Sequence, residues 1–160
     1  MNILLDSGAF SAWSRGQRID LDDYVDFVKA NQHLIDRCVN LDVIPGNFGN
    51  REWRPEAIEA AATASYANQQ KMKEAGLNPL PVFHQDEDFR WLDKYLEDGE
   101  DYICLSASQS ARRDEKLTWL RKCSEVLCPQ GRPLVRTHGL GETSTLICHQ
   151  FPFTSVDSRR

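Results

Sequence analysis

Short apolar segments and longer amphipathic segments alternate along the whole chain. The apolar segments are typical of buried strands and lie at 2–6, 38–44, 80–85, 101–108, 132–139 and 153–158. Between them, apolar residues at helical spacing predict helices at 21–35, 54–76, 87–99, 112–128 and 143–151. Asp20 is suited to the N-cap of a helix, and Pro55 is suited to the first turn of the next one. Gly76 is suited to the end of that helix. Strict alternation of strand and helix predicts right-handed crossovers and a parallel sheet, and so an α/β fold.

Polar residues stand at the carboxyl ends of the predicted strands. They are Asp6, Asp42, His84, Gln85, Ser106, Ser108, Thr137, His138 and Asp157. A TIM-type (βα) barrel builds its active site at these ends, strand after strand. A doubly wound sheet is the alternative, but the segment DSGAFS at 6–11 has one glycine where that fold uses G-x-G-x-x-G. The pattern therefore favours a barrel with a shared polar mouth.

The length of the chain conflicts with a complete barrel. The 160 residues hold about five and a half βα units, whereas a whole barrel needs about 250 residues. We therefore predict one domain, residues 1–160, with an incomplete TIM-type (βα) barrel of parallel strands. Open edge strands and bare helix faces would then be exposed, so we expect either a truncated chain or one completed by another copy or a partner chain.

Composition narrows the class of protein. Hydrophobic residues make up 41% and charged residues 27%, which is typical of a globular protein. The net charge of -5 gives no basic footprint for nucleic acid, although a local cationic groove can sit on an acidic protein. No apolar stretch is long enough to cross a bilayer or to act as a signal peptide. Five cysteines without a C-x-x-C pair favour a reducing, cytoplasmic setting.

Two chemistries suit these residue types. A carboxylate beside a sugar stabilises an oxocarbenium-like transition state or forms a covalent adduct, and a second carboxyl group transfers a proton. Asp6 and Asp157, on the first and sixth predicted strands, could face each other across a barrel mouth. Alternatively, both aspartates could bind a metal ion with His84 and His138, as in hydrolase barrels, although the first strand lacks an H-x-H pair. A plainer interpretation also stands, because aspartate often caps turns and a single histidine is often only packed.

Six segments together resemble a known family. They are LDSGAFSAW at 5–13, NLDVIPG at 40–46, NPLPVFHQ at 78–85, DYICLS at 101–106, THGLG at 137–141 and SVDS at 155–158. The first is similar to the DSGGFQ signature of tRNA-guanine (queuine) transglycosylases. The order of all six resembles the short phage-encoded 7-deazaguanine DNA transglycosylase-like proteins. The resemblance covers nearly the whole chain.

The resemblance implies an exchange of guanine for a 7-deazaguanine in DNA or tRNA through a covalent aspartyl-glycosyl intermediate. It implies Asp157 as the nucleophile and Asp6 as the acid/base and base-recognition residue. The implied substrate-binding residues are Ser7, Gly8, Asp42, His84, Gln85, Ser106, His138 and Gly139. The family's zinc site of three cysteines and a histidine has no matching spacing here, so we expect no cofactor or metal in this chain.

The resemblance also implies partners and a compartment. The expected partners are DNA or tRNA and a 7-deazaguanine base. No membrane is expected as a partner. A second copy of the chain, or another chain that completes the barrel, is a further expected partner. The compartment is the cytoplasm, that of the host if a phage encodes the protein. Because the last strands of the family's barrel have no counterpart, an inactive barrel that acts as a binding or assembly module is the alternative function, beside the metal-dependent hydrolase.

Overall fold

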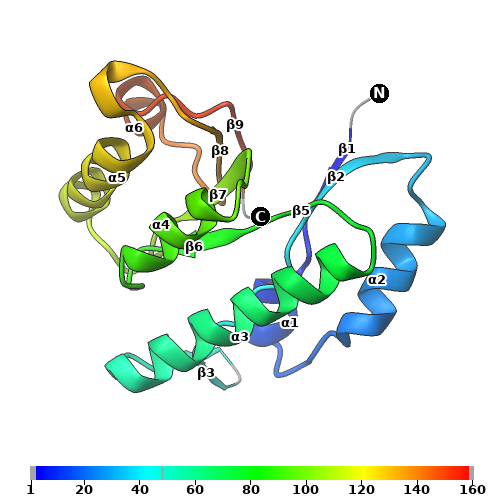
Figure 1. Ribbon diagram of the computed structural model, residues 1–160. Coiled ribbons are helices and arrows are strands. Elements are labelled where there is room, and N and C mark those ends of the chain that lie inside the picture. Colours follow the sequence, from blue (N-terminus) through cyan, green and yellow to red (C-terminus); the bar gives the residue numbers. More distant parts are fainter. Residues whose placement is uncertain (1–2, 48, 159–160) are drawn as a thin grey trace. The chain divides into compact units, whose positions relative to one another are not determined.

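The computed structural model describes residues 3–47 and 49–158. Its chain divides into two compact parts, unit 1 (residues 1–81) and unit 2 (residues 82–160) (Figure 1). Both units combine α-helices with parallel strands, which confirms the α/β class. Residue 2, where the first predicted strand begins, lies outside the described residues. Among the residues described, no helix has the length and apolar character that a membrane crossing requires.

Unit 1 contains a parallel sheet of three strands in the order β1-β2-β5. Its elements are β1 (Ile3–Leu5), α1 (Ala9–Ser14), α2 (Leu21–Ala30), β2 (Ile35–Val39), β3 (Gly46–Asn47), β4 (Asn50–Arg51), α3 (Pro55–Glu74) and β5 (Pro79–Leu80). The strands β3 and β4 form a separate antiparallel pair. The core lies where Tyr24, Val25 and Val28 of α2 pack with Cys38 of β2 and Met72 of α3.

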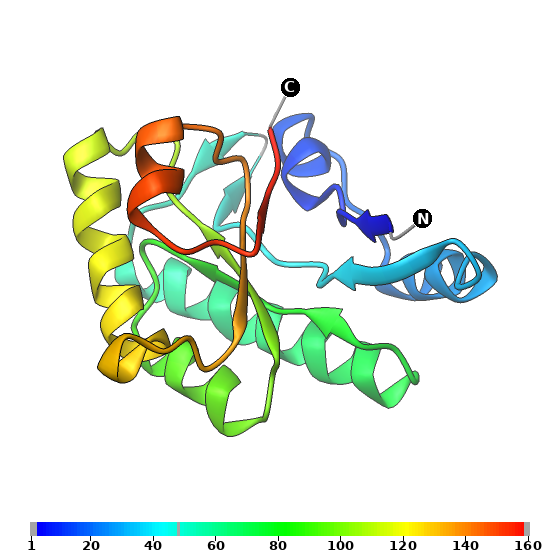
Figure 2. The same cartoon turned by 90° about the horizontal axis from the view of Figure 1, so that it is seen from above.

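Unit 2 contains a parallel sheet of four strands in the order β6-β7-β8-β9. Its elements are β6 (Val82–His84), α4 (Arg90–Glu97), β7 (Tyr102–Ser106), α5 (Arg113–Leu127), the 3-10 helix η1 (Pro129–Gly131), β8 (Arg136–Gly139), α6 (Thr145–Gln150) and β9 (Ser155–Val156). Figure 1 shows α4, α5 and α6 on one side of the strands, and Figure 2 again shows α5 and α6 side by side. Right-handed crossovers that always step in the same direction place their helices on one face.

The helices begin and end where local sequence signals predict. The Asp20 carboxylate accepts hydrogen bonds from the backbone N–H groups of Asp22 and Asp23 at 2.9 and 3.1 Å, which caps α2. Pro55 is the first residue of α3, where a missing N–H costs nothing. Gly76 follows the end of α3 with φ +87°, a conformation that glycine adopts without strain.

The largest difference from the predicted elements lies around the second strand. The helix predicted at 21–35 ends at Ala30, and the strand predicted at 38–44 runs instead over Ile35–Val39. The Asn40 N–H still donates to Leu80 O of β5 at 2.8 Å, but the residues after it bond to α3, where Val43 N–H donates to Ser65 Oγ at 2.8 Å. These partners are distant in the sequence, so no local pattern predicts them.

Other strands are shorter than predicted, and small elements were not predicted. The strand predicted at 80–85 is divided at Pro81, which has no N–H for the ladder. Those predicted at 101–108, 132–139 and 153–158 contract to β7, β8 and β9. Helix α1, the β3–β4 pair and η1 lie where the sequence analysis placed no element.

Candidate functional site in the sheet of unit 2

The carboxyl ends of the four parallel strands of unit 2 meet at one edge of the sheet. His84 ends β6, Ser106 ends β7, Gly139 ends β8, and Asp157 directly follows β9. The register places His84 beside Ser106. Gly139 lies beside Val156, the residue before Asp157. The structure therefore brings these predicted site residues to the same edge of the sheet, as parallel pairing requires.

The two faces of this sheet differ in chemistry. Paired residues of neighbouring strands share a face, and alternate residues of one strand point to opposite faces. Phe83 lies on the face toward the helices, because its ring stacks 5.9 Å from that of Trp119 on α5. The opposite face carries the polar side chains of His84, Ser106, His138 and Ser155. Buried polar groups on the face turned away from the helices form the candidate site.

Asp157 and His138 are the centre of this polar face. Asp157 Oδ1 lies 3.9 Å from His138 Nε2 and accepts a short hydrogen bond from the backbone N–H of Gly141. The Asp157 N–H donates to Gly139 O at 3.3 Å, which fixes the backbone of the carboxylate. The Asp157 side chain is 37% exposed and that of His138 only 5%. Part of the carboxylate is therefore open to solvent, while the imidazole beside it is held in the interior.

Two hydroxyl groups continue the contacts of His138 away from Asp157. His138 Nδ1 lies 2.6 Å from Ser155 Oγ, which in turn lies 2.6 Å from Tyr102 Oη. Sequence reasoning did not select Ser155 or Tyr102 as site residues. Both stand on predicted strands, but only the register of β7, β8 and β9 aligns them with His138.

His84 forms a second buried contact at the same edge. Its Nδ1 lies 2.8 Å from Glu87 Oε1, and its backbone N–H donates to Glu87 Oε2 at 3.3 Å. An ionised carboxylate can only accept, so the contact with that form of Glu87 requires a proton on His84 Nδ1. The two side chains are 8% and 5% exposed. Sequence reasoning missed Glu87, although the spacing H-x-x-E was a signal for such a pair.

Gln85 and Gly139 have positions that packing explains. Gln85 Oε1 accepts a hydrogen bond from Ser108 N–H at 2.9 Å, and the residue lines a cavity of about 350 Å³ with Phe89 and Trp119, toward the helices. A Cβ on Gly139 would lie 3.1 Å from the Phe153 ring, closer than ordinary contact. Neither residue contributes a side chain to the contact between His138 and Asp157, and their substrate-binding roles stay predictions.

The remaining predicted site residues belong to unit 1. Ser7 Oγ accepts from Ala9 N–H at 3.2 Å, and Gly8, with φ +72°, precedes the first residue of α1. Asp6 follows β1 and is exposed, and Asp42 lines a cavity of about 510 Å³ with Trp13. Ser7 and Gly8 thus have a local role at the start of α1, and Asp42 has access to a cavity of ligand size.

The hydroxyl of Tyr24 links the surroundings of the two unit 1 carboxylates. It donates to Val39 O at 2.8 Å, at the end of β2. Burial raises the pKa of Tyr24, and Cys38, Asp6 and Asp42 each raise it further by their negative charge. Both carboxylates therefore act on one buried phenol within unit 1. Burial also raises the pKa of Cys38, to about 11.

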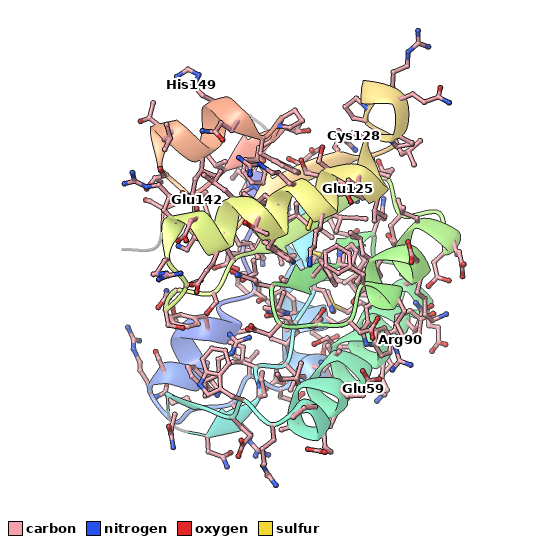
Figure 3. The ribbon with its side chains drawn as sticks, turned by 90° about the vertical axis from the view of Figure 1, so that its left-hand side faces the viewer. Glu59, Arg90, Glu125, Cys128, Glu142 and His149 are labelled. Atoms are coloured by element: carbon pink, nitrogen blue, oxygen red, sulfur yellow. The ribbon has the colours of Figure 1, made fainter. Side chains whose placement is uncertain are left out.

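Several charged residues of unit 2 lie outside the site. Figure 3 looks onto α5 and α6 and shows Glu125 on α5 and His149 on α6, both of which are exposed. Glu142 is buried, and its Oε1 accepts from Ser144 N–H at 2.8 Å just before α6. Within residues 3–47 and 49–158, no group of three or more His, Cys, Asp or Glu side chains could hold a metal ion.

Comparison of the chain with protein-family models, with curated proteins and with solved structures finds no match.

Proposed function

We propose that the protein is a base-exchange transglycosylase that replaces guanine in DNA or tRNA with a 7-deazaguanine, with Asp157 as the nucleophile. One observation carries the proposal: a partly exposed carboxylate, anchored by the Gly141 N–H, lies beside the buried His138 at the carboxyl edge of a parallel sheet. An anchored carboxylate of this kind is suited to attack the anomeric carbon of a nucleoside.

The proposed reaction has two balanced half-steps. In the first, an Asp157 oxygen forms a bond to C1′ as the bond from C1′ to guanine N9 breaks, and the departing guanine takes up a proton from the acid/base carboxyl group, the role that the resemblance gives to Asp6. In the second, the corresponding ring nitrogen of the incoming base returns a proton to that carboxylate and bonds to C1′, and the bond from C1′ to the Asp157 oxygen breaks. One glycosidic bond is lost and one is formed, so the exchange needs no oxidant or reductant.

We also propose the finer fold, an incomplete TIM-type (βα) barrel. In each parallel sheet the strands follow the order of the chain without a reversal, whereas a doubly wound sheet reverses its order. In unit 2 the polar face is the one turned away from α4 and α5, and a barrel needs such an inner face at its mouth. This order and this polarity support the barrel over the open sheet.

The resemblance gives Asp6 and Asp42 the roles of proton transfer and recognition of the purine edge. Each role has its own test. Asp6→Asn is expected to lower kcat, because an amide cannot transfer the proton. Asp42→Asn is expected to raise the KM for the base about 10-fold, since a carboxylate accepts two hydrogen bonds that an amide cannot both accept.

The decisive experiment measures guanine incorporation. The purified chain is incubated with radiolabelled guanine and separate pools of duplex DNA and tRNA. We expect label in one pool and a loss of about 1000-fold or more in Asp157→Asn, since removing a nucleophile removes the covalent route. Glu125→Gln, the same change at an exposed carboxylate on α5, is the matched control and should keep the rate. Absence of label in both pools, or an undiminished rate in Asp157→Asn, overturns the proposal.

A further inference from the structure

The Ser155 hydroxyl stands between two partners in unit 2. Tyr102 Oη and His138 Nδ1 each lie 2.6 Å from Ser155 Oγ. The other imidazole nitrogen of His138, Nε2, lies 3.9 Å from Asp157 Oδ1. Tyr102 comes from β7, His138 from β8 and Ser155 from β9, so the sheet register fixes the sequence of contacts. The four side chains form one directed series that ends at a carboxylate.

A neutral imidazole carries a single N–H, and Ser155 has a single hydroxyl proton, so two arrangements satisfy these distances. In the first, Tyr102 donates to Ser155, Ser155 donates to Nδ1, and the proton of His138 is on Nε2. In the second, Nδ1–H donates to Ser155, which either donates to Tyr102 or also accepts from it, and Nε2 has only its lone pair. The positions of the heavy atoms are the same in both arrangements.

Electrostatics separates the two arrangements. In the first, the N–H dipole of Nε2 points at the Asp157 carboxylate and is attracted to it. In the second, a lone pair faces that carboxylate across 3.9 Å and is repelled. The side chains of His138 and Asp157 are 5% and 37% exposed, so water screens the interaction only from the side of the carboxylate. The first arrangement is therefore the stable one.

We propose that Ser155 and Tyr102 are positioning residues that hold His138 in the tautomer with its proton on Nε2, directed at Asp157. The Gly141 backbone N–H donates to the same Asp157 oxygen, so two N–H dipoles converge on one carboxylate oxygen. Together they stabilise the ionised carboxylate and fix its orientation. The consequence for nucleophilic attack rests on the proposed function, whereas the tautomer itself does not.

The test reads the tautomer directly by long-range ¹H–¹⁵N NMR on protein labelled at histidine. The measurement is made at about pH 8, where an ordinary histidine is neutral. His33, His84 and His149 are the other histidines, so the signals missing in His138→Asn identify His138. We expect a protonated Nε2 and an acceptor-type Nδ1. A proton on Nδ1 of His138 in the unaltered protein overturns the inference.

Variants then test whether the two hydroxyl groups cause this tautomer. Ser155→Ala removes the donor to Nδ1 and is expected to move His138 toward the Nδ1-protonated form or a mixture. Tyr102→Phe is expected to do so to a smaller extent, whereas Ser155→Thr keeps a hydroxyl and should restore the Nε2 form. Ser158→Ala, the same change at an exposed position, should leave the tautomer unaltered. An unaltered tautomer in Ser155→Ala overturns the inference, provided its amide spectrum shows a folded chain.

The exchange assay separates this inference from the proposed function. If the chain exchanges guanine, Ser155→Ala is expected to lower kcat about 10-fold at an unchanged KM for the base, and Ser155→Thr to recover it. If the tautomers are as expected but the unaltered chain exchanges nothing, the nucleophile proposal fails and the positioning of His138 stands. If Ser155→Ala lowers KM and kcat together without moving the tautomer, the positioning role fails.

Discussion

Polar residues at the carboxyl ends of strands serve different purposes in the two units. In unit 1, the polar groups after β2 hold a loop to a helix: Asn40 Nδ2 donates to Ser65 O, and Asn68 Nδ2 donates to Leu41 O, each at 2.8 Å. In unit 2, the polar groups at the ends of β8 and β9 contact one another across the sheet, as His138 does with Ser155. The hydrogen-bond partners of a polar strand end therefore distinguish a residue that holds a loop, such as Asn40, from a residue of the candidate site, such as His138.

Burial separates the two units in a second way. In unit 1, Asn40 and Ser65 have no exposed surface and act as internal braces. In unit 2, Asp157 keeps an accessible carboxylate next to buried partners. Substitutions at the unit 1 residues should therefore change stability, and substitutions at the unit 2 edge should change chemistry first.

The largest expected effect concerns the face of unit 2 that carries no site. Phe83 has no exposed surface and packs against Phe89 and Trp119 at 5.3 and 5.9 Å. Phe83→Ala is expected to lower the free energy of unfolding by about 3–5 kcal/mol, because it leaves a cavity. Urea unfolding measures the change. Phe27→Ala, at a ring that is 54% exposed, is the control and should cost about 1 kcal/mol or less. Equal costs would mean that the helix side of the unit 2 sheet is not a packed core.

A smaller effect tests the hydrogen bond between Ser65 of α3 and Val43 of the loop after β2 in unit 1. Ser65→Ala leaves the Val43 N–H without its acceptor and is expected to cost about 1–3 kcal/mol of unfolding free energy. Thr63→Ala removes a hydroxyl from an exposed position of the same helix, where it bonds to Glu59 O, and should cost less than about 0.5 kcal/mol. The His138 tautomer should be the same in both variants. A changed His138 tautomer in Ser65→Ala would contradict the view that Ser65 stabilises unit 1 without affecting the candidate site of unit 2.

The smallest effect appears only at high pH. Tyr24 has a raised pKa, with burial the main cause, so above about pH 10 the unfolded chain loses a proton that the folded chain keeps. The stability from this residue is complete below that pH and falls above it by up to about 1.4 kcal/mol per pH unit. The free energy of unfolding, measured at about pH 9 and about pH 11, should fall less between these two pH values in Tyr24→Phe than in the unaltered chain. The raised pKa of Cys38 acts with the same sign in both proteins, and because the hydrogen bond with Tyr24 lowers that pKa, its loss in Tyr24→Phe reduces the expected difference. Equal falls in the unfolding free energy of the two proteins would contradict the prediction that the hydroxyl of Tyr24 is buried with a raised pKa.

The sequence predicted the order of the main elements because their signals are local. Asp20 and Pro55 begin helices by satisfying or sparing N–H groups that lie within a few residues. The end of β2 was placed too late, since the apolar residues of 40–44 resemble a strand but their partners are on α3. Helix α1 was missed because its start depends on the left-handed conformation of Gly8.

The candidate site was predictable only in part, because some of its residues have local sequence signals and others are brought together only by strand pairing. His84, His138 and Asp157 were selected by their place at strand ends and by the resemblance, and the structure places them at one edge of unit 2. Ser155 and Tyr102 were missed because only the pairing of β7, β8 and β9 brings them to His138. Whether Asp157 is a nucleophile stays a prediction until exchange is measured.

The unreversed strand order has a consequence for how the chain forms during synthesis. Each parallel ladder joins a strand to the next strand of its own sheet, so a ladder can close as soon as one further βα unit has left the ribosome. No strand has to insert later between two that are already paired. In each of these sheets the growing chain therefore leaves only the two outer strands unpaired on one side, which limits the surface that a neighbouring nascent chain could join.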